Sequence, residues 1–274
     1  MSPVTTVDQV WNGVQEVKAT AGTFCTNFYA TPARLQGWID RGEVLRIPSE
    51  RTCFFVRRDR DFCHLFFCAP DLEALRREIT ELPILATERL TVDVVGSEPT
   101  LAELLRALES AGLSRYARLM RLVRGQPSAA SPATAEGSRI ELPHPSDCPA
   151  IGKLLESCFD RFADQLPLSY EIEAAVGANQ VLVVKCEGAM AALLFFETQG
   201  FTSTVRYWAV GEGFRSHGFG SALMRHYFVS HSKVRRFILW VRADNENAVQ
   251  KYRHYDYGPD GLVDYVLVNE VIRT

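Results

Sequence analysis

A segment in the second half of the chain combines glycine, arginine and serine in a spacing suited to holding a phosphate. It reads Arg215-Ser216-His217-Gly218-Phe219-Gly220-Ser221 and follows the apolar run Trp208-Ala209-Val210. Unpaired N–H groups in the first turn of a helix point outward, and the helix dipole gives them positive partial charge. Glycine allows close approach of the backbone, and arginine adds a fixed charge. The segment therefore predicts an anion site where a strand turns into a helix, although a plain helix-opening turn is the simpler alternative.

A second segment follows after one further predicted strand. Asp244 and Asn245 end that strand, and both residue types are good helix caps. Ala248 and Tyr252 then fall on one helical face, four residues apart. Tyr252 alone is typical of a core aromatic, but the two segments in this order, on these elements, are far more specific together than either is alone.

The two segments resemble the motifs of the GNAT superfamily of N-acetyltransferases. The pyrophosphate-loop motif of that family, [RQ]-x-x-G-x-[GA], is similar to Arg215–Gly220, and its N-x-x-A-x-x-x-Y motif is matched by Asn245, Ala248 and Tyr252. The strand end Trp208–Val210 is similar to the "LAV" strand of the family. The resemblance extends over roughly residues 139–274.

The resemblance implies an acetyl-CoA cosubstrate and a role for each matched residue. Backbone N–H groups between Arg215 and Ser221 would hold the pyrophosphate, and the strand edge Trp208–Val210 would pair with the pantetheine arm, close to Asn245. Tyr252 would protonate the departing thiolate, and the N–H of Val210 is the natural oxyanion donor. Transfer to an amine needs a neutral nucleophile, a stabilised oxyanion and a protonated leaving group.

The general base is left open by the sequence. Trp240 occupies the position where some family members have a glutamate, and Asp256 the position of a common glycine. We expect Glu197 to join Tyr252 as a catalytic residue; the other candidates are Tyr207, Asp160, Glu171 or a water relay. Since Arg206 and Tyr207 alternate across the strand, only one of them can face the substrate, and Arg206 there would favour an acceptor with a carboxylate.

A stretch rich in Pro, Ser, Ala and Gly, Gly125–Gly137, separates two halves of similar length. We therefore predict domains over 1–125 and 138–274, joined by a linker over 126–137. Hydrophobic periodicity gives the second half the order β-α-α-β-β-β-α-β-α-β and the first half nearly the same order. With the resemblance, this predicts an α/β (α+β) chain of two tandem GNAT-like domains, each a mixed, mostly antiparallel sheet flanked by helices.

The first half resembles the family in architecture alone. Its corresponding strand-to-helix turn, Cys68–Glu73, has no glycine and carries an acidic residue where a pyrophosphate would lie. We expect a degenerate copy that cannot hold coenzyme A and that supplies packing.

Composition limits the other classes of function. The 274 residues are 47% hydrophobic and carry a formal net charge of −3, which argues against a disordered chain and against binding nucleic acid by phosphate neutralisation. No apolar run suits a membrane helix and the start of the chain lacks a secretory signal, so a cytoplasmic protein without a membrane partner is expected.

The seven cysteines form no C-x-x-C pair, which favours core thiols over a metal site or a disulfide framework. Cys63 is the one cysteine beside a histidine, and the two neighbours point to opposite faces of a strand.

The leading hypothesis is thus an acetyl-CoA-dependent N-acetyltransferase that acts on a small amine, such as an amino acid, by direct attack in a ternary complex, without a metal. Two alternatives stay open: a longer-chain acyltransferase similar to glycine N-acyltransferases, and a non-catalytic CoA-binding module. The oligomeric state is also open, a homodimer included.

Overall fold

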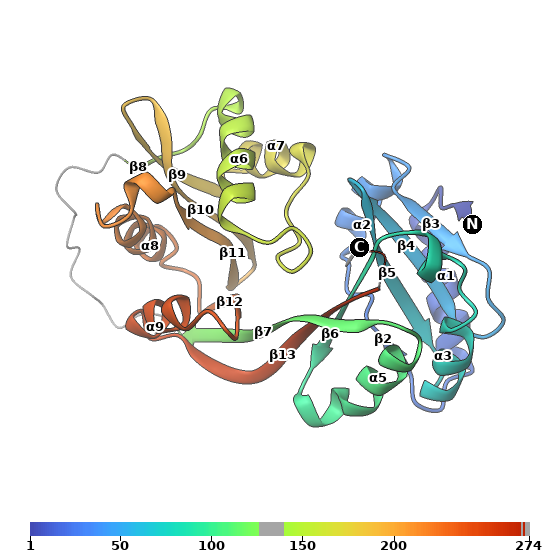
Figure 1. Cartoon of the computed structure of the whole chain (residues 1–274). Helices are drawn as coiled ribbons and strands as arrows, with labels where there is room; N and C mark the ends of the chain where they lie inside the picture. The colour runs from blue at the N-terminus through green and yellow to red at the C-terminus, as the bar shows by residue number, and fades with distance from the viewer. Residues whose placement is uncertain (126–139, 270, 272–274) are drawn as a thin grey trace. The chain divides into compact units, whose positions relative to one another are not determined.

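The protein divides into two compact units. The structure is a computed structural model and describes residues 1–125, 140–269 and 271. The first unit comprises Met1–Leu119 together with Gly261–Thr274, and the second comprises Met120–Asp260 (Figure 1). The predicted linker, 126–137, lies outside the described residues.

In the first unit the strand order is β1-β3-β4-β5-β6-β13. Strand β5 pairs parallel with β6, whereas the pairs β1–β3, β3–β4, β4–β5 and β6–β13 are antiparallel, so the sheet is mixed and mostly antiparallel. The strands are β1 (Ser2–Pro3), β2 (Cys25–Thr26), β3 (Val44–Ile47), β4 (Cys53–Asp59), β5 (Phe62–Ala69), β6 (Leu90–Gly96), β7 (Ser114–Gly125) and, from the end of the chain, β13 (Gly258–Val268). The helices are α1 (Val7–Ala19), α2 (Pro32–Ile39), α3 (Leu72–Ile79), α4 (Ile84–Thr87) and α5 (Glu98–Ser110).

In the second unit the order is β7-β12-β11-β10-β9-β8, with β11 and β12 parallel. The strands are β8 (Ile140–Glu141), β9 (Val181–Cys186), β10 (Ala189–Gln199), β11 (Thr202–Val210) and β12 (Arg236–Arg242). The helices are α6 (Cys148–Cys158), α7 (Ser169–Gly177), α8 (Phe219–Ser230) and α9 (Glu246–His254), with short 3-10 turns η1 (Pro145–Asp147) and η2 (Glu212–Phe214).

The predicted fold class is confirmed: both units follow one plan, a mixed and mostly antiparallel sheet flanked by helices. The structure adds helix α1 and strand β3 to the elements that periodicity predicts for the first half. A signal for α1 was present. Val10, Val14 and Val17 recur at helical spacing, and Thr6 forms a capping box with Gln9.

The ends of the two units differ from the predicted division. Strand β13 was expected to complete the second domain, but its residues Val263–Val268 pair antiparallel with β6 of the first unit. The last residues of β7, by contrast, belong to the second unit. Periodicity shows which face of a strand is buried but not which sheet the strand joins, so the sequence alone could not place these strands.

Each sheet is covered on both faces. In the first unit one core cluster includes Leu65 and Val92, and the opposite face packs α1 and α2 through residues such as Leu35. In the second unit α8 and α9 cover one face around Tyr227, and α6 and α7 cover the other around Ile151.

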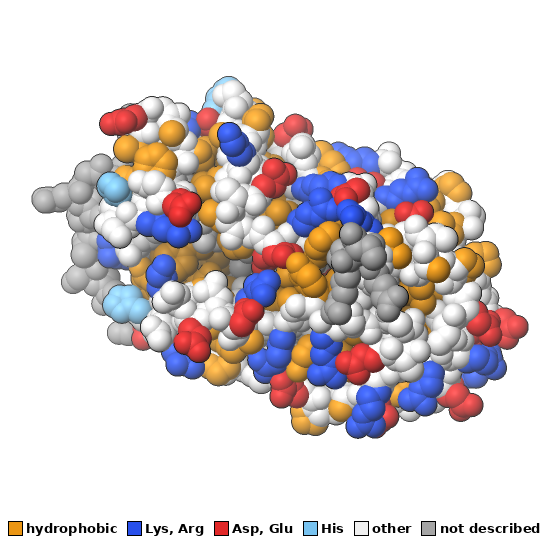
Figure 2. Space-filling model, in the orientation of Figure 1, with side chains coloured by type: hydrophobic (Ala, Val, Ile, Leu, Met, Phe, Trp, Pro, Cys, Tyr) orange, Lys and Arg blue, Asp and Glu red, His pale blue; other side chains and the backbone are white. Residues whose placement is uncertain are grey.

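On the face that Figure 2 shows, Lys and Arg side chains lie among Asp and Glu side chains and do not gather by sign. Within the part of the chain that the structure describes, no helix has the length and apolar content to cross a membrane.

A short segment of the first unit covers the edge of β5 where β6 leaves it. Strand β6 pairs with β5 only at Cys63 and His64, and β2 pairs with the far end of the same edge, at Cys68 and Ala69. Between these points the buried Asn27 side chain donates from Nδ2 to the carbonyl of Leu65 (2.9 Å) and accepts at Oδ1 from the N–H of Phe67 (2.7 Å). The side-chain amide thus pairs with the strand as a backbone amide would.

Replacement of Asn27 should therefore destabilise the first unit. Asn27→Ala leaves a buried carbonyl and a buried N–H without partners, and we expect a loss of about 2–4 kcal/mol in the free energy of unfolding. Urea unfolding followed by circular dichroism measures it. The matched control is Asn12→Ala on the exposed side of α1, where alanine favours the helix and no loss is expected. Equal midpoints for the two variants would contradict the assigned role of Asn27.

Candidate active site

Strand β11 carries one residue more than β10 can pair with. Val205 lies opposite Phe196, and Tyr207 lies opposite the preceding residue, Phe195. Arg206, between them, has no partner on β10, so it forms a β-bulge. A bulge bends a strand and increases its twist. It also changes which side chains share a face. Val205 and Trp208 are three residues apart and would face opposite sides of a regular strand, but here both contribute to the core cluster beneath α8 and α9.

The parallel pairing of β11 with β12 runs up to the bulge. Its register extends from Thr202 opposite Arg236 to Val205 opposite Leu239, whereas both strands continue, β11 to Val210 and β12 to Arg242. Beyond Val205 the two strands separate, and this edge of β11 is left for another group.

The end of β11 presents its backbone to that separated edge. The N–H of Gly211 donates to the carbonyl of Ala191 (2.9 Å), while Val210 lies directly opposite Ala192. In an antiparallel pair, this pattern makes Val210 and Ala192 a non-hydrogen-bonded pair, so the N–H and C=O of Val210 point away from β10. Leu194 and Trp208 are the equivalent pair two residues away. Backbone groups at Trp208 and Val210, on either side of Ala209, can therefore bind an extended ligand.

The loop after β11 leads into α8 with no side chain capping the helix. Ser216 (φ 70°) and Gly218 (φ 77°) adopt left-handed conformations, and Gly218 is the N-cap residue. The first backbone bond of the helix joins the N–H of Ala222 to the carbonyl of Gly218 (2.9 Å). The N–H groups of Phe219, Gly220 and Ser221 come earlier, in the turn where helical N–H groups lack intrahelical partners. The arrangement fits an anion site.

The side chains of Arg215 and His217 lie exposed on this loop. Nδ1 of His217 lies 3.0 Å from the carbonyl oxygen of Arg215, and its ring stacks on Phe219 with centroids 5.6 Å apart. The histidine therefore shapes the loop locally.

Gly220 has a packing role that the sequence did not reveal. A Cβ atom there would lie 3.2 Å from the Trp208 ring and 3.1 Å from Val210 Cγ2. The indole Nε1 of Trp208 donates to the Gly220 carbonyl (3.1 Å). Gly220 is thus required because α8 approaches β11 closely. Gly218 is required because its φ is positive.

Tyr252 lies beside the same strand. It is 9% exposed, and its ring centroid is 5.5 Å from that of Trp208. Burial, together with the charge of Asp164, raises the pKa of the Tyr252 hydroxyl, so it remains protonated at neutral pH. Asn245, predicted near the pantetheine arm, caps α9: its Oδ1 accepts from the N–H of Ala248 (3.1 Å). Its cap position explains the residue type without a ligand.

The structure does not bring Glu197 to Tyr252 in any contact of the described residues. The Glu197 side chain is 52% exposed and lies 3.4 Å from the guanidinium of Arg206. Burial lowers the pKa of the Arg206 guanidinium, but the charges of Tyr207, Glu197 and Glu171 raise it by more, so the net pKa is raised. The charge of Arg206 is therefore matched within the protein, which removes the reason to expect it to bind a carboxylate of the acceptor.

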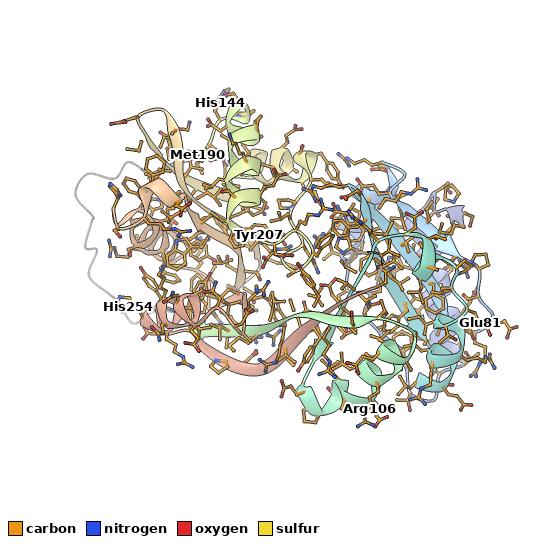
Figure 3. The ribbon with its side chains drawn as sticks, viewed as in Figure 1. Glu81, Arg106, His144, Met190, Tyr207 and His254 are labelled. Atoms are coloured by element: carbon orange, nitrogen blue, oxygen red, sulfur yellow. The ribbon has the colours of Figure 1, made fainter. Side chains whose placement is uncertain are left out.

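The loop between α6 and α7 carries Asp164, a residue that the sequence did not mark as a candidate for the site. Tyr207 lies on β11 (Figure 3). Its hydroxyl shares one proton between two main-chain carbonyls of this loop, that of Gln165 at 2.6 Å and that of Asp164 at 3.1 Å. Burial raises the pKa of the Asp164 carboxyl to about 6, with contributions from the charges of Asp160 and Asp244. No spacing rule connects Asp164 to the motifs, since a hydrogen bond to its backbone, rather than to its side chain, brings it there.

Comparison with known proteins bears on the same elements. Residues 149–257, which contain the bulge, the uncapped helix and Tyr252, match the model of the acetyltransferase (GNAT) family. The second unit contains a GNAT domain. A search of curated protein sequences finds no match to the chain.

Solved structures with the same fold span both units. A tandem GNAT protein from the clavulanic acid biosynthesis pathway has a TM-score of 0.59 and 12% identity, with 97% of each chain covered. A GNAT-family acetyltransferase from Colwellia psychrerythraea has a TM-score of 0.56 and 8% identity over 97% of this chain and 98% of its own. A GCN5-related N-acetyltransferase from Sphaerobacter thermophilus has a TM-score of 0.58 and 15% identity over 80% and 76%. These likenesses establish the tandem GNAT fold.

The first unit has the GNAT arrangement but caps the corresponding helix itself. Helix α3 follows β5 as α8 follows β11, and its N-cap residue is Asp71. The Asp71 carboxylate accepts from the N–H of Ala74 (2.7 Å) and pairs with Arg51 (3.0 Å). The bond from Ala74 is the main cause of its lowered pKa. A carboxylate of the protein thus lies at the start of α3, whereas the start of α8 in the second unit presents uncapped N–H groups.

The cysteines are free, and four of the seven are buried. Burial raises the pKa of Cys63 to about 11, and its side chain lies in the core opposite His64, which contacts Asp59 (3.1 Å) and Thr91 (3.0 Å). The expectation that Cys63 and His64 face opposite sides of the sheet is confirmed. Among the described residues, no group of three or more His, Cys, Asp or Glu could hold a metal ion.

The packing of Gly220 predicts an asymmetry between two glycines, Gly213 and Gly220, that lie between the end of β11 and the first turn of α8. Gly220→Ala places a methyl group against the Trp208 ring, and we expect a loss of about 1–3 kcal/mol in the free energy of unfolding. Gly213→Ala, in η2, meets no atom within 4 Å and should be neutral or slightly stabilising. Thermal unfolding of both variants tests this prediction, and equal loss in both would contradict it.

Proposed function

We propose that the second unit transfers an acetyl group from acetyl-CoA to the primary amine of a small molecule, by direct attack in a ternary complex. The observation that carries the proposal is the uncapped start of α8 beside the separated edge of β11, within reach of Tyr252. A backbone anion site and an open strand edge would bind the CoA thioester, and a protonated phenol would protonate the leaving thiolate.

Each predicted residue then has a specific contribution. The N–H groups from Arg215 to Ser221 would bind the pyrophosphate, and the edge at Trp208–Val210 would pair with the amides of the pantetheine arm. The N–H of Val210, which points away from β10, would stabilise the oxyanion. Tyr252 would protonate the thiolate; its raised pKa keeps the proton available.

We further propose that the first unit binds no coenzyme A. Asp71 fills the anion position of α3, and Asn27 fills the strand edge of β5. The two parts of the ligand site are thus replaced by the protein's own carboxylate and amide. Acetyl-CoA should bind with a stoichiometry of one per chain.

The N-cap of α8 allows a direct test of acetyl-CoA binding. Gly218→Asp introduces a carboxylate where Asp71 caps α3, and we expect its repulsion of the pyrophosphate to raise the Kd for acetyl-CoA at least about tenfold, or 1.4 kcal/mol. Gly218→Asn is the matched control, since asparagine tolerates the left-handed conformation and carries no charge. Isothermal titration calorimetry at low salt measures both. Equal affinities in the two variants, or no binding by the wild type, would contradict the assigned site.

Tyr252→Phe tests the proton donor. We expect kcat to fall about 10²-fold or more in an assay of free CoA with a panel of amines, while the Kd for acetyl-CoA is unchanged. Tyr257→Phe is the matched control: its hydroxyl is buried without a partner among the described residues, so its removal should leave turnover intact. Wild-type turnover by Tyr252→Phe would sink the proposed role, and a panel of acyl-CoA chain lengths would separate acetyl transfer from longer-chain transfer.

A further inference from the structure

Hydrogen bonds within the second unit fix the loop that carries Asp164. Oδ1 of Asp160 accepts from the N–H groups of Phe162 and Ala163 (both 2.9 Å), and the N–H of Asp160 donates to Oδ2 of Asp164 (2.8 Å). The hydroxyl of Tyr207 holds the carbonyls of Asp164 and Gln165 from the other side. The position of the Asp164 carboxylate is therefore set by reciprocal bonds.

This carboxylate lies within electrostatic range of the proposed proton donor. Its charge acts on Tyr252 of α9, and it lies in the field of Arg242 and Asp244, at the separated end of β12. Asp160 is the remaining charged neighbour, from its own loop. Arg242 is engaged by Asp244 at 2.8 Å, which limits how far it can stabilise the Asp164 charge.

One carboxylate oxygen of Asp164 remains available. Oδ2 accepts the N–H of Asp160, whereas Oδ1 has no partner among the described residues, and the side chain is only partly buried. A side chain that is fixed, partly buried and open at one oxygen is suited to accept a proton from a bound substrate.

We propose that Asp164 is the general base that deprotonates the acceptor ammonium. The inference rests on the proposed function of the second unit. The ammonium gives one proton to Oδ1 of Asp164, and the neutral amine attacks the thioester carbonyl carbon, which forms the C–N bond and then breaks the C–S bond. Tyr252 gives its proton to the departing thiolate and regains one from the amide nitrogen, while Asp164 releases its proton to solvent.

The expected pH dependence has a definite sign. Since burial raises the pKa of Asp164 to about 6, the carboxylate is ionised at neutral pH and is a stronger base than an exposed aspartate. Activity should be lost as the pH falls, with log kcat/KM decreasing with a slope of one below about pH 6.

The experiment measures kcat/KM from pH 5 to 9 with an amine that the wild type acetylates. Asp164→Asn keeps an oxygen to accept the N–H of Asp160, and we expect kcat to fall about 10²-fold or more, with loss of the acid limb and an unchanged Kd for acetyl-CoA. Asp164→Glu should recover part of the rate together with the limb. Glu173→Gln, an exposed carboxylate on α7, is the matched control and should keep both rate and limb.

The unfolding temperature of Asp164→Asn distinguishes a catalytic role of Asp164 from a structural one, because only a structural role predicts that it falls. A carboxyl whose pKa is raised in the folded state lowers stability once it is ionised, above its folded pKa. Asp164→Asn should therefore unfold at the same or a higher temperature than the wild type at pH 7.5. A lower temperature with lost activity would indicate a structural residue and overturn the proposal.

The remaining outcomes separate the two hypotheses. Wild-type kcat/KM in Asp164→Asn, or loss of the acid limb in Glu197→Gln instead, would overturn the role of Asp164 and leave the proposed function intact. Failure of the wild type to bind acetyl-CoA or to acetylate any amine would contradict the proposed function and, with it, this inference.

Discussion

The unpaired residue Arg206 in β11 is the constraint on which the second unit depends. Because β10 has no partner for it, β11 bends at this point, and its pairing with β12 ends at the neighbouring Val205. Past the bulge the alternation of side chains is reset, so Trp208 faces α8 and α9 while Tyr207 faces the loop after α6. One extra residue thus opens a strand edge and turns one aromatic side chain toward each side of it.

The two units show how one fold can either present or fill the same site. In the first unit β4 and β5 pair without a register shift, from Cys53 opposite Cys68 to Asp59 opposite Phe62. The other edge of β5, beyond its short pairing with β6, is covered by the Asn27 side chain. The helix that follows is capped by Asp71, whereas Gly218 caps α8 with no side-chain bond. A side-chain amide and a carboxylate, each from within the chain, satisfy these backbone groups in the first unit, whereas no side chain caps α8 in the second. This difference in satisfied hydrogen bonds, rather than in topology, distinguishes the units.

The sequence predicted best what depends on local rules. The strands Val181–Cys186 and β10, helix α8 and the cap at Asn245 follow from periodicity, glycine and capping preferences, all of which act within a few residues. It predicted least what depends on pairing between distant segments. Nothing local distinguishes a β13 that pairs with β6 from one that completes its own half. The two glycines of the loop looked equivalent in sequence, but Gly218 serves backbone conformation and Gly220 serves packing on Trp208.

Asp164 illustrates why the proposed base was harder to find in the sequence than the glycine-containing loop before α8. A partly buried carboxylate lowers stability when ionised, so it persists only where other bonds hold its loop. Here those bonds come from a tyrosine on a remote strand to main-chain carbonyls, and from the paired turn of Asp160. Main-chain acceptors exist at every residue, so the sequence around Asp164 carries no mark of this contact. A family motif records the groups that bind the cosubstrate common to all members, whereas the acceptor side is built from contacts of this kind, which only the folded chain brings together.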